Sequence, residues 1–97
     1  MSELEDRSVA IRAAGENIDV APLLELAQRA VVVLRRNTAG SKESLTVKVS
    51  ATERGAVIRL RSTNPGKHKE ILLAAVNGQL EIAKDQIKAS IVRSVNQ

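Results

Sequence analysis

The sequence predicts an α+β domain of two layers, with the element order strand, helix, strand, strand, helix. Two runs that alternate between apolar and polar residues, 44–50 and 57–61, flank a short connection and indicate a β-hairpin. Apolar residues recur at helical spacing on both sides of that hairpin, within 19–37 and 65–95, and a shorter alternating run at 8–13 precedes them. We therefore expect both helices to pack on one face of a small antiparallel or mixed sheet, with the longer helix at the C-terminal end.

The first strand is predicted from residues 8–13, where Val9 and Ile11 fall on one side and Arg12 on the other. Before it, Glu3, Glu5 and Asp6 make the start of the chain acidic, and we expect residues 1–7 to form a flexible arm. The 97 residues are expected to fold as one domain, 1–97, because a chain of this length supports a single core.

The first helix has a start signal and a stop signal. Asp19 is a suitable N-cap, and Pro22 falls in the first turn, where its missing N–H costs little. The residues on its predicted apolar face are Val20, Leu23, Leu24, Ala27, Val31 and Leu34. Residues 37–40 end it with a glycine. Three consecutive valines at 31–33 would also suit a strand, but the caps and the length of the segment favour a helix.

The hairpin is predicted to turn its aliphatic residues toward the helices and its basic ones toward solvent. Leu45, Val47 and Val49 alternate with Thr46 and Lys48 in the first run, and Ile58 and Leu60 alternate with Arg59 and Arg61 in the second. Residues 52–55 form the connection, in which we expect Gly55 to take the left-handed conformation.

The last third of the sequence allows two interpretations. Asn64 and Pro65 resemble an N-cap and a first-turn proline, and the apolar residues of 65–95 gather on one side of a single long helix. Alternatively, Asn77-Gly78 is a strong signal for a two-residue turn, which would create an extra hairpin and shorten the last helix to 84–95. We favour the long helix, since one internal glycine costs only about 1 kcal/mol.

A long helix would carry a second apolar strip that the sheet does not cover. The residues of this predicted strip are Ile71, Ala75, Ile82 and Ala89. Exposed apolar area of this kind favours association, so we expect a homodimer formed through the C-terminal helix.

Composition excludes several classes of protein. The sequence contains no Cys and no Phe, Tyr or Trp, so it has no disulfide framework, no thiolate chemistry and no aromatic platform on which single-stranded bases could stack. It has no apolar run of about 20 residues, and we expect no membrane span and a cytoplasmic protein.

Catalytic motifs are not evident. His68 lies between two lysines and is expected to be an exposed loop residue. Gly66-Lys67 lacks the earlier glycine and the following Ser or Thr of a phosphate-binding P-loop. With one histidine and no cysteine we predict no metal site, no cofactor and no enzymatic activity.

The net charge of +4 makes anionic partners plausible. If the first strand joins the hairpin, several cations share the outer face of the sheet or the loop beside it. These candidate phosphate-binding residues are Arg12, Lys48, Arg59, Arg61, Lys67 and Lys69.

The sequence thus predicts a small non-catalytic interaction or assembly module that self-associates through its last helix. The alternative is a nucleic-acid-binding module, or one that binds an acidic protein, through the basic sheet face. A third hypothesis is an assembly unit whose hairpin edge pairs with a neighbouring chain.

Overall fold

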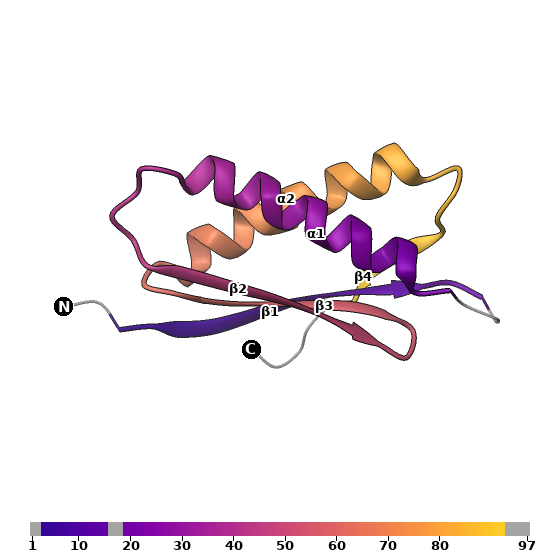
Figure 1. The fold of residues 1–97 in the computed structure, drawn as a ribbon, viewed down its shortest axis with the longest axis horizontal. Coiled ribbons are helices and arrows are strands. Elements are labelled where there is room, and N and C mark those ends of the chain that lie inside the picture. The colour runs from indigo at the N-terminus through magenta and orange to yellow at the C-terminus, as the bar shows by residue number, and fades with distance from the viewer. Residues whose placement is uncertain (1–2, 16–18, 93–97) are drawn as a thin grey trace.

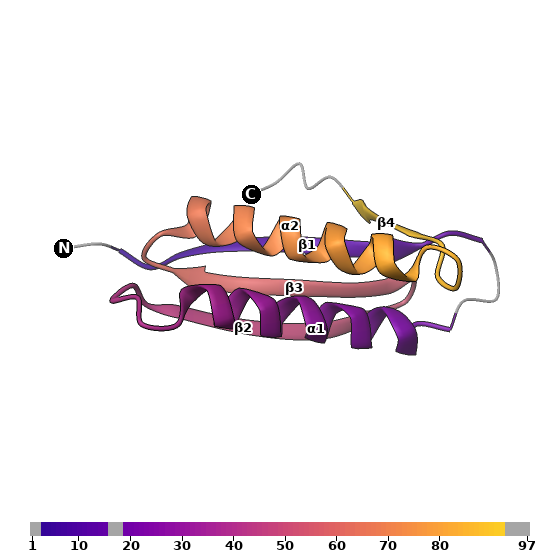
Figure 2. The ribbon, with the colours of Figure 1, turned by 90° about the horizontal axis from the view of Figure 1, so that it is seen from above.

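The computed structural model describes residues 3–15 and 19–92, which form four strands and two helices. In chain order these elements are β1 (Glu5–Ala13), α1 (Ala21–Thr38), β2 (Leu45–Thr52), β3 (Gly55–Ser62), α2 (Pro65–Ala83) and β4 (Ala89–Val92). The strands pair antiparallel in the order β2-β3-β1-β4. Both helices lie on one face of the sheet and leave the other face open (Figure 1), with α1 over the β2 side (Figure 2). The predicted two-layer α+β architecture is confirmed.

β1 is longer than predicted, and part of the expected N-terminal arm belongs to it. Residues 5–7 pair with the end of β3, where Glu5 lies opposite Ser62 and Arg7 opposite Leu60. The strand therefore begins at Glu5 and not at Ser8. Residues 1 and 2 of that arm lie outside the described residues. Its acidic sequence is compatible with a strand because the end of β3 supplies the backbone partners.

α1 follows the prediction with small shifts at both ends. Asp19 accepts a hydrogen bond from the amide of Ala21 over 3.1 Å, although the helix itself begins at Ala21. At the other end, Asn37 donates to the carbonyl of Val33 and Thr38 to that of Leu34, which satisfies two of the last carbonyls of the helix. Gly40 then has a φ of 84°, a conformation that favours glycine.

The hairpin is confirmed, but its glycine has a different role from the one expected. Thr52 pairs with Gly55 across the two-residue link Glu53-Arg54, and the φ of Gly55 is not positive. Gly55 lies instead against β1, where a Cβ would overlap the backbone carbonyl oxygen of Ile11. Close approach of two strands, and not turn geometry, requires glycine here.

α2 runs without interruption through Asn77-Gly78, so the alternative hairpin at that site is wrong. The helix nevertheless ends at Ala83, well short of the predicted 95; residues 93–95 lie outside the described part of the chain. After it, Ala89–Val92 pairs with β1 as β4, a strand that the sequence analysis missed. The open edge of β1 supplies the hydrogen-bonding partners that favour a strand over further helix.

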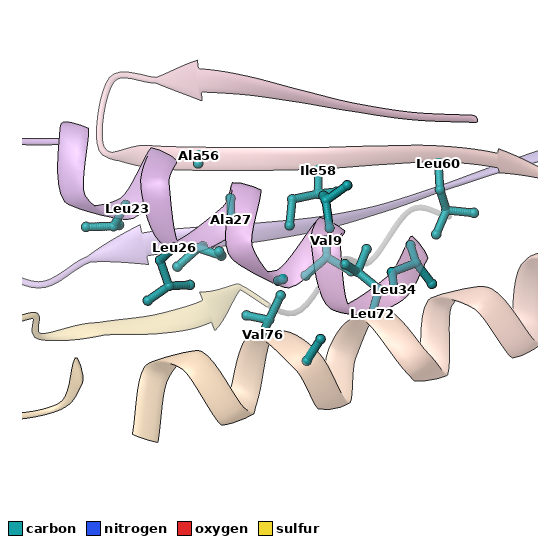
Figure 3. Close-up of a cluster of buried hydrophobic side chains, with 14 of the residues drawn as sticks. Val9, Leu23, Leu26, Ala27, Leu34, Ala56, Ile58, Leu60, Leu72 and Val76 are labelled. Atoms are coloured by element: carbon teal, nitrogen blue, oxygen red, sulfur yellow. The ribbon is translucent and has the colours of Figure 1, made fainter. Parts of the chain in front are cut away.

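The core lies between the helices and the inner face of the sheet and consists of aliphatic side chains (Figure 3). β1 contributes Val9 and Ile11, and β3 contributes Ile58 and Leu60, all nearly inaccessible to solvent. The helices add Leu23, Leu26, Ala27, Ala30, Leu34, Leu72 and Val76. Within the described residues, neither helix is long and apolar enough to span a membrane.

Candidate functional site

The open face of the sheet carries the side chains that alternate with the core residues, and the strand register places them in rows. One row contains Thr46, Arg61 and Asp6, and the next contains Lys48, Arg59 and Ser8. Each row crosses β2, β3 and β1, so neighbouring side chains lie about 5 Å apart. Three of the predicted cations therefore come together on this face.

These two rows line a shallow depression of about 550 Å³. We call it the basic depression and define it by the side chains that point to the open face, namely Asp6, Ser8, Thr46, Lys48, Arg59 and Arg61. The three cations outnumber the one carboxylate, and Ser8 and Thr46 add hydroxyl groups. Such a surface can donate several hydrogen bonds to an anion at once.

The three cations of the basic depression differ in whether an acidic side chain already pairs with them. Arg61 Nε lies 3.2 Å from Asp6 Oδ1, an exposed ion pair that partly neutralises it. Among the described residues, Lys48 and Arg59 form no salt bridge with an acidic side chain. An incoming anion would therefore meet Lys48 and Arg59 first, while Asp6 opposes its approach to Arg61.

Arg12 shares the open face but lies outside the basic depression. It is four residues beyond Ser8 on β1, which is about 13 Å at the rise of a strand. Between the two positions lies a row formed by Ser50, Val57, Ala10 and Val92. The prediction that Arg12 faces away from the core is correct, whereas its grouping with the other cations is looser than expected.

Lys67 and Lys69 do not belong to this face. Both lie in the first turns of α2, which packs on the opposite face of the sheet. Lys67 Nζ lies 3.1 Å from Glu43 Oε1 and pairs with that carboxylate. Their predicted place in a loop beside the sheet is therefore wrong, because α2 already begins at Pro65.

His68 differs most from expectation, since it is fully buried and not exposed. Its Nδ1 lies 2.5 Å from Ser62 Oγ, which also accepts the amide of Asn64 over 2.8 Å. Ser62 Oγ and His68 Nδ1 thus share one hydrogen bond, whose donor is set by the tautomer of the ring. Nε2 lies 3.5 Å from Glu43 Oε1 and has no other polar partner among the described residues.

Glu43 collects hydrogen bonds from three segments of the chain. Its carboxylate accepts from Asn64 Nδ2 over 2.6 Å, from Ser41 Oγ over 3.0 Å and from Lys67 Nζ. The bond from Asn64, followed by those from Lys67 and Ser41, lowers the pKa of Glu43 from 4.5 to about 2. The carboxylate is thus held in its charged form.

Serine, histidine and glutamate are also the residue types of hydrolytic triads, whose serine must be accessible to substrate. Ser62 and His68 are both fully buried, and the serine oxygen is occupied by Asn64. The cluster joins the end of β3, the loop before β2 and the start of α2. No three His, Asp or Glu side chains within the described residues gather as ligands for a metal ion.

A sequence signal for the burial of His68 exists. His68 lies four residues before Leu72 and eight before Val76, on the same helical side as these two core residues. The sequence analysis missed this periodicity because Lys67 and Lys69 on either side of His68 are typical of an exposed loop.

The strip predicted for self-association is not present. Ala75 is buried in the core, and Ala89 belongs to β4 and not to a helix. Ile71 is half-buried, and Ile82 remains exposed, with 79% of its surface accessible. The predicted strip requires a helix that extends to residue 95, whereas α2 ends at Ala83.

No protein-family model matches the chain, and no curated protein sequence matches it. Solved structures resemble it in fold. One is the solution NMR structure of a de novo designed protein, LFR1 1, with ferredoxin fold, at a TM-score of 0.67 and 17% identity, covering 98% of this chain and 86% of that one. Another is the crystal structure of the intact alpha subunit of aIF2 from Pyrococcus abyssi, at a TM-score of 0.60 and 14% identity. The chain described here covers 36% of that subunit, and the match covers 99% of the chain. At these identities the likeness concerns the fold, which is ferredoxin-like.

Proposed function

We propose that this protein is a nucleic-acid-binding module that contacts phosphates through the open face of its sheet. The observation that carries the proposal is the basic depression, in which Lys48, Arg59 and Arg61 line one concave surface. Nucleic acid presents closely spaced phosphates, and binding several of them releases counterions. A cytoplasmic location is part of this proposal, and an acidic protein is the competing partner.

The decisive experiment compares charge reversal on the two faces of the molecule. Arg59→Glu with Arg61→Glu should weaken binding of a fluorescently labelled oligonucleotide about a hundredfold, because two phosphate contacts become repulsions. Arg29→Glu with Arg36→Glu changes the net charge equally on the exposed side of α1 and is the matched control. Anisotropy of the label at several salt concentrations measures affinity, and far-UV circular dichroism checks folding.

A second variant tests the proposal through a gain of affinity, which misfolding cannot produce. Asp6→Asn removes the one carboxylate that lines the basic depression among the described residues and releases Arg61 from its ion pair. We expect roughly threefold tighter binding with little change in stability, since exposed ion pairs contribute little. The sheet face is rejected as the binding site if the wild type and both double variants bind the oligonucleotide equally. The same holds if Asp6→Asn binds it no more tightly than the wild type. Preference for acidic protein over oligonucleotide would reject nucleic acid as the partner.

We also propose self-association, now through the edge of the sheet. Among the described strands, β2 pairs only with β3, and its inward residues Leu45, Val47 and Val49 remain half-exposed. Unpaired strand edges readily add a further strand. Light scattering over a dilution series should show a dimer, with hydrogen exchange of β2 amides slowing as concentration rises. A monomer at every concentration would contradict this second proposal.

A further inference from the structure

The open face carries a second feature beside the basic depression, a row of aliphatic side chains. Ala10 pairs with Val57 on β3 and with Val92 on β4, so the three side chains lie next to one another across three strands. We call these three residues the apolar row. Val92 is 38% exposed, and Ala10 and Val57 are half-buried although neither of the two described helices covers this face.

Cationic and apolar groups alternate along the strands on this face. The row of Lys48, Arg59 and Ser8 is followed two residues further, at about 7 Å, by the apolar row, which the exposed Ser50 continues on β2. Another two residues along β1 lies Arg12, which is exposed. A ligand that runs along the strands would therefore meet positive charge, then apolar surface, then positive charge again.

The chemistry that matches this order is a chain of anionic groups with flat, weakly polar groups between them. From this alternation we infer that the open face binds single-stranded nucleic acid, with phosphates at the basic depression and at Arg12 and bases over the apolar row. The inference rests on the proposed function and names its substrate class. Aliphatic side chains contact the faces of bases and form no hydrogen bonds to their edges, so we expect binding that is independent of base sequence.

Double-stranded nucleic acid fits the same surface poorly. A duplex keeps its base faces stacked inside, so these faces cannot cover Ala10, Val57 and Val92. Four strands span about 14 Å, which exceeds the roughly 12 Å width of the major groove, so the face cannot enter it. A duplex would contact the cations only through the phosphates on its outer ridge.

Three probes separate the contributions of phosphate and base. They are a single-stranded oligothymidylate, a duplex of the same length, and inorganic polyphosphate, which has no bases. The wild type should bind oligothymidylate at least about tenfold more tightly than the duplex at equal salt. Polyphosphate binding should weaken in the double variant Arg59→Glu with Arg61→Glu and should stay constant when the apolar row is changed.

Variants at Val57 test the apolar row in both directions. Val57→Phe places an aromatic ring in the row and should strengthen oligothymidylate binding about tenfold, while polyphosphate and duplex binding stay constant. Val57→Thr keeps the branched shape but adds a hydroxyl and should weaken oligothymidylate binding alone. Val32→Phe, at a position 47% exposed on α1, is the matched control and should change none of the three affinities.

The outcomes distinguish failure of this inference from failure of the proposed function. If the duplex binds as tightly as the single strand and Val57→Phe changes neither, the single-strand inference is wrong while the phosphate-binding proposal stands. If none of the three probes binds, or if reversal of Arg59 and Arg61 has no effect, both fail. Val57→Phe is expected to raise the affinity for oligothymidylate, and loss of folding cannot produce such a rise. Phe also has a high strand propensity.

Discussion

At the scale of single residues, the surroundings of His68 and Glu43 show how burial changes the role of a side chain. The buried imidazole is held by Ser62 on one side and faces the Glu43 carboxylate on the other. Asn64 is the N-cap of α2 but forms no side-chain hydrogen bond with that helix, and its Nδ2 donates to Glu43. The cluster thus replaces a local cap with contacts between distant segments.

Acid should weaken the folded state through Glu43. The folded pKa of about 2 lies below the ordinary value of 4.5, so the hydrogen-bonded carboxylate stabilises the protein above about pH 4.5. That stabilisation is lost as the pH falls from about 4.5 through 2. Urea unfolding followed by circular dichroism between pH 2 and 7 should show a smaller acid-dependent loss in Glu43→Gln than in the wild type.

Glu53→Gln is the control for this pH experiment, since Glu53 lies exposed in the hairpin link. It should retain the wild-type dependence on pH. If Glu43→Gln and the wild type lose stability in parallel, the acid transition has another origin.

At the scale of elements, the pair Asn77-Gly78 shows how context overrides a turn signal. α2 continues through it because Leu72, Ala75 and Val76 bury one side of the helix against the sheet and α1. The burial of these side chains outweighs the roughly 1 kcal/mol that a glycine costs within a helix.

The glycines of two elements should respond oppositely to alanine. Gly78→Ala meets open space on α2 and should raise the free energy of unfolding by about 1 kcal/mol. Gly55→Ala would overlap the carbonyl of Ile11 and should lower it by at least about 1–3 kcal/mol. Urea denaturation measures both. A stable Gly55→Ala would show that β1 and β3 can separate locally without cost.

At the scale of the whole molecule, both described helices lie on one face of the sheet, and neither of them covers the other face. The strand order puts β3 and β1 in the centre, so their outward residues lie in the middle of that open face. β4 then extends the face by Val92, which completes the apolar row. The proposed binding surface therefore draws on all four strands, which the topology brings side by side.

Much of the fold and of the candidate site could be predicted from the sequence, because both depend on local patterns of apolar and polar residues. Alternation in the hairpin fixes the orientation of Lys48, Arg59 and Arg61, whatever the strand order is. Arg12 follows in the same way from β1. In contrast, Ile87 and Ile91 suit the side of a helix as well as an alternating strand, so the end of α2 could not be located from periodicity.

The sequence by itself determined the two layers, the aliphatic core and the exclusion of aromatic stacking, because composition and periodicity act locally along the chain. The tertiary structure alone decided the burial of His68, the pairing of Lys67 with Glu43, the formation of β4 and the grouping of Ala10 with Val57 and Val92. Each of these contacts joins residues that are distant in sequence or depends on a vacant strand edge. Such contacts form only when the sheet assembles, since their partners are absent from any local window of the chain.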